Sequence, residues 1–376
     1  MMFTEDRSPD ASVAISSAIQ NVIRKQLELS IRPIVTGEYE RTMFCNGFFE
    51  HLQGMEISND LRIPGDFRRG LKNIEALKEL GAKTFGGAIA TSKIKHVESP
   101  YLPVWETMKQ DIPPDQWKDC KMSFISPTWQ HVHLVKNTAY TSAAYTTDKG
   151  YFDDLTAAYH QEFQTLYDAG LRSIQVDDPI LTYFILDDFR EELRRDGIDP
   201  DELLSMYIDV HNQAIAGLPQ DMYTSIHLCR GNMPKNMPAH TSFNASGSYE
   251  RIAEALFTRL QHNTLCLEFD DARSGNFEPL RHVRKDTNVV LGLISTKSPE
   301  LENLESMKGR IKEAAEIIAR GQGRKPEEVL QDTLAVSTQC GFATSHTGRG
   351  VESEENMWEK LMLVRELAKA TWADTV

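Results

Sequence analysis

Four side chains that can bind a transition metal lie at the ends of three apolar segments in the second half of the chain. His227 and Cys229 lie in YTSIHLCRGN, Glu268 lies in TLCLEFDD, and Cys340 lies in LAVSTQCGF. His227 and Cys229 are two residues apart, so their side chains point to the same side if the segment is a strand. One imidazole, two thiolates and one carboxylate form a set of ligands suited to tetrahedral zinc.

The spacing alone leaves a second interpretation open, because His-x-Cys is not a zinc-finger spacing. Buried cysteines are common and often behave as small hydrophobic side chains. Cys229, Cys266 and Cys340 would then be core residues, and His227 would be a hydrogen-bonded core histidine. The residues alone favour this interpretation. We retain it for Cys266, because a fifth donor would overfill a tetrahedral site.

Continuous apolar segments rich in Val, Ile and Leu predict the strands that would position these residues, since such segments are typical of buried parallel strands. These segments are residues 31–35, 122–126, 173–176, 223–228, 264–269, 288–294 and 333–338. Helices are predicted at residues 12–28, 154–169, 249–260, 300–320 and 354–372. The alternation of strands and helices indicates a parallel sheet with right-handed crossovers.

The same pattern favours a (β/α)₈ barrel, also called a TIM barrel, over an open doubly wound sheet. No Gly-rich dinucleotide-binding fingerprint follows an early strand. In a barrel the carboxyl ends of the strands open on one face, where active sites are found, so the four side chains could converge there. Residues 231–247 follow one of these strands and are a candidate lid.

Several sequence blocks, in one order from about Ile31 to Trp372, carry a resemblance to a known family. They are TGEYER, SIQVDDP, HLCRGN, LEFDDARSGNFEPLR, VVLGLISTK and STQCGFAT. The chain resembles the catalytic domain of cobalamin-independent methionine synthase, and more closely the stand-alone, single-barrel members of that family. The resemblance implies an α/β, single-domain TIM barrel over residues 31–376, preceded by a polar segment and helix at residues 1–30. It also implies that His227, Cys229, Glu268 and Cys340 are zinc ligands.

The implied function is a zinc-dependent thiol methyl- or alkyltransferase, for which homocysteine to methionine is the reference reaction. A free thiol is mostly protonated near neutral pH, whereas zinc stabilises the nucleophilic thiolate. The thiolate would then attack an electrophilic alkyl carbon, such as the methyl group of 5-methyltetrahydropteroyltriglutamate. We expect Glu268 to be the most exchangeable ligand, because a carboxylate is less soft than sulfur.

Carboxylates near two earlier strands are candidates for binding the thiol substrate. Glu38 lies in TGEYER, and Asp177 and Asp178 lie in QVDDP. The resemblance implies that Glu38 and Asp177 accept charge-assisted hydrogen bonds from the amino group of homocysteine. We assign Asp177 a catalytic role as well. Asp178 stands where the family usually has glutamate, and it either contacts substrate or caps a loop before Pro179.

Two positions depart from the long enzymes of this family. His133 stands where they have the tryptophan that stacks on the pterin, and Lys297 stands where they have the histidine that protonates the folate. We assign Lys297 a catalytic role, but lysine is a poor proton donor unless its pKa is lowered, so Lys297 could instead bind a carboxylate or other anion on the substrate. His133 either lines a pocket for the donor or belongs to a structural loop. Both changes favour a second hypothesis, a zinc thiol transferase that acts on another electrophile, such as an epoxide or a specialised metabolite.

A third departure is an atypical or missing first strand, since only a polar segment and a helix precede residues 31–35. A missing strand leaves an exposed edge in a barrel. It motivates a third hypothesis, a degenerate barrel that binds without catalysis. A fourth hypothesis is the related barrel of uroporphyrinogen decarboxylase, which uses no metal, so a filled His/Cys/Glu/Cys site would argue against it.

Composition limits the classes of partner. The chain has 376 residues, is 40% hydrophobic and has a formal net charge of −14, which argues against nucleic acid or an anionic membrane as a partner. It has no signal peptide pattern and no apolar run near the roughly 20 residues of a membrane span. Five widely spaced cysteines favour free thiols or metal ligands in a reducing compartment. We therefore expect a cytoplasmic enzyme, either monomeric or a homo-oligomer, with a homocysteine-like thiol and an alkyl donor as its substrates.

Overall fold

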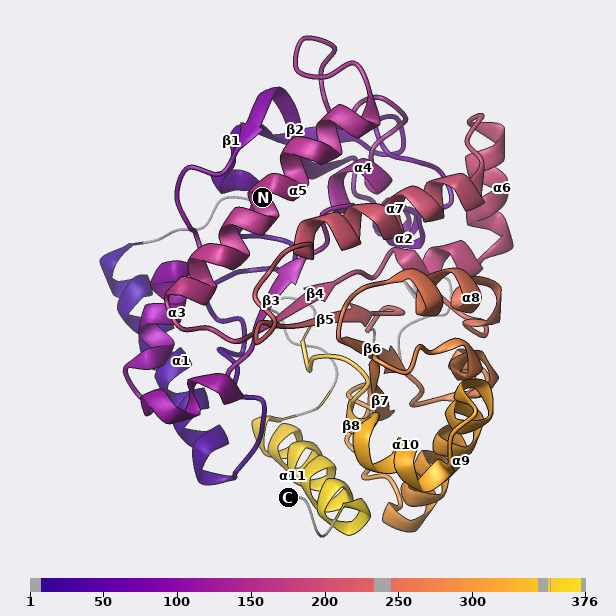
Figure 1. Ribbon diagram of the computed structural model, residues 1–376. Coiled ribbons are helices and arrows are strands. Elements are labelled where there is room, and N and C mark those ends of the chain that lie inside the picture. Colours follow the sequence, from indigo (N-terminus) through magenta and orange to yellow (C-terminus); the bar gives the residue numbers. More distant parts are fainter. Residues whose placement is uncertain (1–7, 233–244, 344–350, 352, 373–376) are drawn as a thin grey trace. The chain divides into compact units, whose positions relative to one another are not determined.

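The computed structural model describes residues 8–232, 245–343, 351 and 353–372 (Figure 1). Most of the candidate lid at residues 231–247 therefore lies outside the described residues. The chain divides into two compact units. The first unit comprises Met1–Arg69, Leu77–Asp177 and Asp209–Thr224; the second comprises Gly70–Ala76, Asp178–Ile208 and Ser225–Val376.

The first unit begins with helix α1, Pro9–Glu28, which confirms the predicted N-terminal helix. The Ser8 side chain caps it by accepting a hydrogen bond from the Ala11 backbone N–H. Ile19 and Ile23 of α1 are buried, and α1 packs against α3, Leu102–Lys109, as Figure 1 shows. The boundary at residue 30 between an N-terminal segment and the barrel stays a prediction.

An antiparallel pair of strands, which the sequence does not predict, forms the next part of the first unit. Strand β1, Gln53–Arg62, pairs with β2, Thr84–Lys95, and helix α2, Lys72–Glu79, lies between them in sequence. Strand β2 packs against the long helix α5, Asp148–Asp168.

Two parallel strands of the first unit confirm predicted segments. Strand β3, Met122–Ile125, pairs with β4, Ser173–Asp177, and the short helix α4, Trp129–His133, follows β3. The strand predicted at residues 31–35 is wrong: only Ile34 forms an isolated parallel bridge, with Cys120. Pro33 has no N–H to donate, so this segment cannot continue a ladder of hydrogen bonds.

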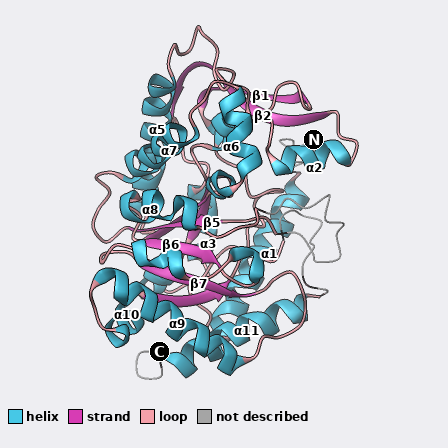
Figure 2. Ribbon diagram, turned by 90° about the vertical axis from the view of Figure 1, so that its right-hand side faces the viewer, coloured by secondary structure: helices cyan, strands magenta, loops and turns pink. Residues whose placement is uncertain are grey.

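The second unit contains a parallel sheet in which consecutive strands are neighbours, as Figure 2 shows for β6 and β7. Its strands are β5 (Tyr223–Leu228), β6 (Thr264–Glu268), β7 (Asn288–Ile294) and β8 (Leu334–Thr338). All four match predicted segments. Strands β5, β6 and β7 are almost entirely buried, which explains why apolar residues run continuously along them.

Helices alternate with these strands. They are α6 (Asp187–Arg195), α7 (Pro200–Ile215, whose last turns belong to the first unit), α8 (Glu250–Arg259), α9 (Leu304–Gln322), α10 (Pro326–Asp332) and α11 (Glu354–Thr371). Helix α9 packs against α10 and does not stop before Gly321 as predicted. It ends instead at Gly323, whose φ of 61° is left-handed. Gly321 is required inside the helix, because a Cβ there would overlap the carbonyl group of Arg281. Among the described residues, no helix has the length and apolar character needed to cross a membrane.

Candidate metal centre and substrate carboxylates

The second unit brings all four predicted metal ligands together at the carboxyl ends of its strands. His227 lies in β5, Cys229 follows it, Glu268 ends β6, and Cys340 follows β8. One potential ligand atom from each of the four lies within 4.8 Å of all the others. Cys266 is not part of this group, which agrees with its interpretation as a core residue.

The geometry of this group fits zinc. The Sγ atoms of Cys229 and Cys340 are 3.7 Å apart, far longer than the ~2.05 Å of a disulfide. Two sulfurs each ~2.3 Å from one tetrahedral zinc ion would be about 3.8 Å apart. The His227 Nδ1 lies 3.3 Å from the Cys266 carbonyl oxygen. Donation from Nδ1–H to this oxygen would orient the ring and make Nε2 the metal-binding nitrogen.

The Glu268 carboxylate is fully buried, and only one of its two oxygens has a hydrogen-bond partner. Its Oε1 accepts a hydrogen bond of 2.7 Å from the Arg230 backbone N–H, whereas its Oε2 is buried with no hydrogen-bond partner. An unsatisfied buried carboxylate oxygen is costly, and a cation would satisfy it. The Tyr249 hydroxyl accepts a hydrogen bond from the Glu268 N–H and donates one to the Leu228 carbonyl. It therefore ties the end of β6 to the end of β5.

Electrostatics also favour a bound cation. The hydrogen bond with Cys340, together with burial, raises the pKa of Cys229 well above its ordinary value. Burial raises the pKa of Glu268, although His227 and Lys297 oppose this effect. Without a metal, the surrounding protein groups therefore disfavour the ionised forms of Cys229 and Glu268. A divalent cation would reverse that balance, and its binding would release protons.

Lys297 follows β7 and lies in a buried ion-pair cluster. Its Nζ is 2.6 Å from Asp270 Oδ2 and 3.4 Å from Asp271 Oδ2. The side chains of Lys297 and Asp270 are 2% and 0% exposed. Arg273 forms a second ion pair with Asp271. The sequence does not predict the role of either aspartate, because two acids after a strand look the same in sequence whether they face a buried lysine or solvent.

The first unit contains Glu38 and Asp177. The Glu38 Oε1 accepts hydrogen bonds of 2.5 Å from both Arg41 Nη2 and Ser123 Oγ. Although burial opposes it, these partners lower the pKa of Glu38. Asp177 ends β4 and accepts a hydrogen bond of 2.6 Å from Gln175. Against the effect of burial, Glu38 and Asp177 both raise the pKa of the buried Arg41, so the two carboxylates belong to one polar cluster.

Asp178 has a structural role in the second unit. Its fully buried carboxylate accepts hydrogen bonds from the backbone N–H groups of Ile180 and Leu181, at 2.9 and 2.8 Å. It thereby fixes the backbone that leads into the 3₁₀ turn Leu181–Ile185. The Asp178 N–H also donates to the carbonyl of His227. Asp178 is therefore positioned beside a candidate ligand while its side chain stabilises the following loop.

His133 lies at the end of α4 in the first unit and is 2% exposed. Its ring centroid is 4.0 Å from that of Trp129, and its Nδ1 lies 2.7 Å from the Trp129 carbonyl oxygen. These contacts hold the buried His133 ring against Trp129, one turn earlier in the same helix. A donor could stack on His133 only after the ring became exposed.

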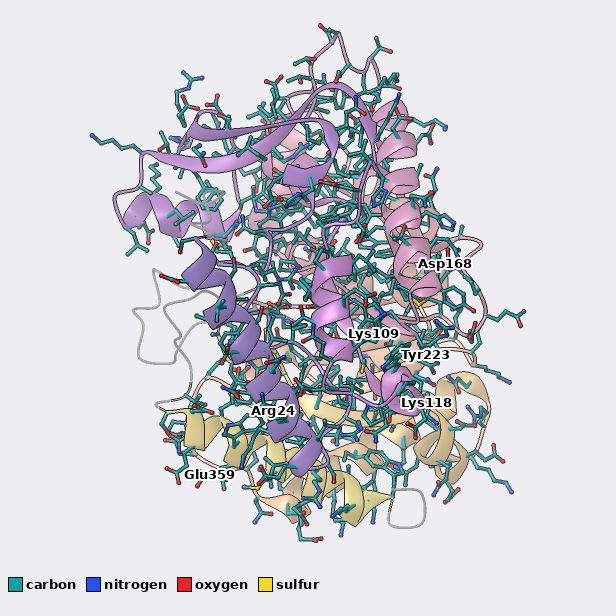
Figure 3. All side chains as sticks on the ribbon, turned by 90° about the vertical axis from the view of Figure 1, so that its left-hand side faces the viewer. Arg24, Lys109, Lys118, Asp168, Tyr223 and Glu359 are labelled. Atoms are coloured by element: carbon teal, nitrogen blue, oxygen red, sulfur yellow. The ribbon has the colours of Figure 1, made fainter. Side chains whose placement is uncertain are left out.

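An open cavity of about 620 Å³ also lies in the first unit, at the amino ends of the parallel strands. Lys118 and Tyr223, which line it, are labelled in Figure 3. None of the predicted site residues lines this cavity. The amino-terminal face of a barrel serves stability rather than catalysis, so we assign the cavity no role in the reaction.

Comparison with known proteins identifies the family. The profile of the cobalamin-independent synthase catalytic domain matches residues 143–361. The uncharacterized protein YxjH of Bacillus subtilis (strain 168) is 33% identical over 359 residues, which cover 94% of this chain and 84% of YxjH. The chain belongs to the cobalamin-independent methionine synthase family.

A solved structure and a further sequence relative agree with this membership. A candidate vitamin-B12-independent methionine synthase from Listeria monocytogenes aligns with a TM-score of 0.66 and 26% identity, covering 99% of this chain and 95% of that one. The methionine synthase of Sulfolobus acidocaldarius is 21% identical over 96% of this chain and 85% of its own length. Membership of the methionine synthase family confirms the α/β TIM-barrel fold class and indicates a methionine synthase-like transferase.

Proposed function

We propose that this member of the methionine synthase family is a zinc-dependent thiol methyltransferase, which converts a homocysteine-like thiol to its methyl thioether. The observation that carries the proposal is the convergence of His227, Cys229, Glu268 and Cys340 within 4.8 Å. Zinc bound there would lower the pKa of the substrate thiol and hold it as a thiolate at neutral pH.

The protein residues prepare this site in two ways. Cys229 and Cys340 supply two soft, electron-rich ligands, and His227 supplies an oriented imidazole. Glu268 is the harder donor and hence the one most readily exchanged for an incoming sulfur. Its hydrogen bond from the Arg230 N–H would retain the carboxylate nearby after such an exchange.

The polar cluster of the first unit supplies the second half of the proposal. Glu38 and Asp177 would accept hydrogen bonds from the ammonium group of an amino-thiol substrate. Arg41 and Ser123 fix the Glu38 carboxylate, and Gln175 fixes Asp177. Asp177 would act in catalysis by binding the ammonium group of the substrate. Asp178 and His133 would support the site through the turn and the helix that they stabilise.

Lys297 favours a second candidate function, in which the alkyl donor is not methylfolate. Its ammonium group is neutralised by Asp270 and Asp271, so its protons are already engaged. We propose that Lys297 acts chiefly through its charge, which helps to keep Glu268 ionised. The electrophile would then be another alkyl donor, such as an epoxide or a specialised metabolite.

Metal analysis combined with product analysis tests the proposal. The wild-type protein should contain stoichiometric zinc and convert homocysteine to its methyl thioether in the presence of a suitable donor. His227→Ala and Cys340→Ala should bind zinc weakly and below stoichiometry and should lose turnover, whereas Cys266→Ala, a matched control outside the group, should retain both properties. Wild-type protein without zinc, or turnover that does not need Cys229, would refute the proposal. A panel of donors separates the two candidates, because efficient methionine formation from methylfolate would exclude the second.

A further inference from the structure

Three buried polar side chains surround the backbone on both sides of Cys340. Asn232, Thr296 and Gln339 are 5%, 0% and 1% exposed. They come from different segments, because Asn232 follows the Cys229 segment, Thr296 follows β7 and Gln339 follows β8. All three therefore lie at the strand ends that carry the candidate metal centre.

The carbonyl group of Gly341, directly after Cys340, is held by two of these side chains. It accepts hydrogen bonds from Asn232 Nδ2 at 2.5 Å and from Thr296 Oγ1 at 3.0 Å. Two donors on one carbonyl fix the orientation of the peptide plane more firmly than one donor does. The chain is thereby fixed immediately after the cysteine.

Gln339, directly before Cys340, is fixed through its side chain and its backbone. Its Oε1 accepts a hydrogen bond of 2.7 Å from the Thr296 backbone N–H, and its Nε2 donates to Thr296 Oγ1 and Asn232 Oδ1 at 3.0 and 3.3 Å. Its backbone N–H donates to the Ile294 carbonyl at 2.9 Å. The chain is therefore fixed on the other side of the cysteine as well.

We propose that Asn232, Thr296 and Gln339 are positioning residues that hold the Cys340 sulfur in place to bind a metal with Cys229. This inference rests on the proposed function, because it takes Cys340 to be a zinc ligand. The other two ligands have separate supports: the Cys266 carbonyl for His227 and the Arg230 N–H for Glu268. Loss of the polar network should therefore act on zinc binding mainly through Cys340. Residues that orient metal ligands in this way typically contribute 10- to 100-fold to metal affinity.

The Thr296→Val variant tests this role, since it removes the hydroxyl group and keeps the size of the side chain. We expect about a 10- to 100-fold loss of zinc affinity, measured by competition with a chromophoric chelator on the full-length protein. Thr296→Ser should restore most of the affinity. Thr156→Val is the matched control, because Thr156 is equally buried and its hydroxyl bonds only to carbonyls of its own helix, α5. This control should lower the melting temperature and leave zinc affinity unchanged.

A double-mutant cycle distinguishes positioning from general stability. In a Cys340→Ala background, Thr296→Val should cause little further loss of zinc affinity, because the ligand it positions is already absent. Gln339→Met serves as a second variant if Thr296→Val does not fold. Two results would overturn the inference while leaving the proposed function intact. One is a network variant with wild-type zinc affinity. The other is a Thr296→Val substitution that lowers zinc affinity by the same factor in the Cys340→Ala background as in the wild type. Wild-type protein that binds no zinc would overturn both.

Discussion

The sulfur atoms of Cys229 and Cys340 lie 3.7 Å apart, although 111 residues separate the two cysteines in sequence. The contact depends on the parallel pairing of β5 to β8, which brings the two strand ends to the same edge of the sheet. The site is therefore a product of strand register. A substitution that shifts one strand would disrupt zinc binding even if it left every ligand intact.

Removing the charge of Lys297 should lower the free energy of unfolding, because Lys297 forms a buried ion pair. Lys297→Met should destabilise the protein by roughly 3–5 kcal/mol, because Asp270 would remain buried without its counter-ion. Chemical denaturation at neutral pH measures the change in the free energy of unfolding.

The double variant Lys297→Met/Asp270→Leu is the control for this prediction. Replacing both charges by apolar side chains of similar size is often close to neutral, so the double variant should recover most of the lost stability. A single variant as stable as the wild type would show that Asp270 gains no stability from Lys297.

Asp177→Asn should weaken binding of an amino thiol without removing zinc. A hydrogen bond between charged groups contributes roughly 1.5–3 kcal/mol, so we expect the KM for homocysteine to rise about 10- to 100-fold. Steady-state kinetics and metal analysis of the same preparation provide the two measurements. A thiol that lacks the amino group is the control substrate, and its KM should be nearly the same for both proteins. An equal rise in KM for both thiols would argue against an ammonium contact at Asp177.

The lowered pKa of Asp148 should make the stability of the folded protein depend on pH in the acid range. The hydrogen bond with His131 lowers the pKa of Asp148 from 3.8 to about 2, and Tyr140 also donates to it. Because the folded pKa is below the unfolded one, this stabilisation is complete above about pH 4 and is lost as the pH falls towards 2. The shift corresponds to roughly 2 kcal/mol at most.

Asp148→Asn should therefore lower stability at pH 7 and flatten the loss of stability between about pH 4 and pH 2. Denaturant unfolding at several pH values measures both effects. The two proteins should converge in stability as the pH falls through this window. Parallel curves for wild type and variant would contradict the assignment of this pKa.

The sequence predicts the sheet of the second unit well, because each strand is a continuous apolar segment of ordinary strand length. It does not predict the antiparallel pair of β1 and β2, whose residues are partly polar and partly exposed. Each of these two strands depends on pairing with the other, and that pairing is not visible in local composition. Residues 31–35 show the opposite error, since their apolar character suggested a strand that Pro33 prevents.

The convergence of the four candidate ligands could be predicted because each ends or follows a recognisable strand and because the surrounding sequence blocks match a known family. The contacts that support them could not. Lys297 forms a buried ion pair with Asp270, and the carbonyl of Gly341 beside Cys340 accepts buried hydrogen bonds. These contacts join segments that lie 27 to 109 residues apart in sequence. Neither periodicity nor spacing in the sequence specifies which side chains meet across such distances.

X-ray absorption at the zinc K-edge, recorded before and after addition of homocysteine, tests the proposed thiol activation most directly. Without substrate, zinc should have two sulfur ligands at ~2.3 Å and two nitrogen or oxygen ligands. Homocysteine should add a third sulfur and remove one oxygen, consistent with the exchange of Glu268. A spectrum that homocysteine leaves unchanged, or protein that contains no zinc, would contradict a mechanism in which this site activates the thiol.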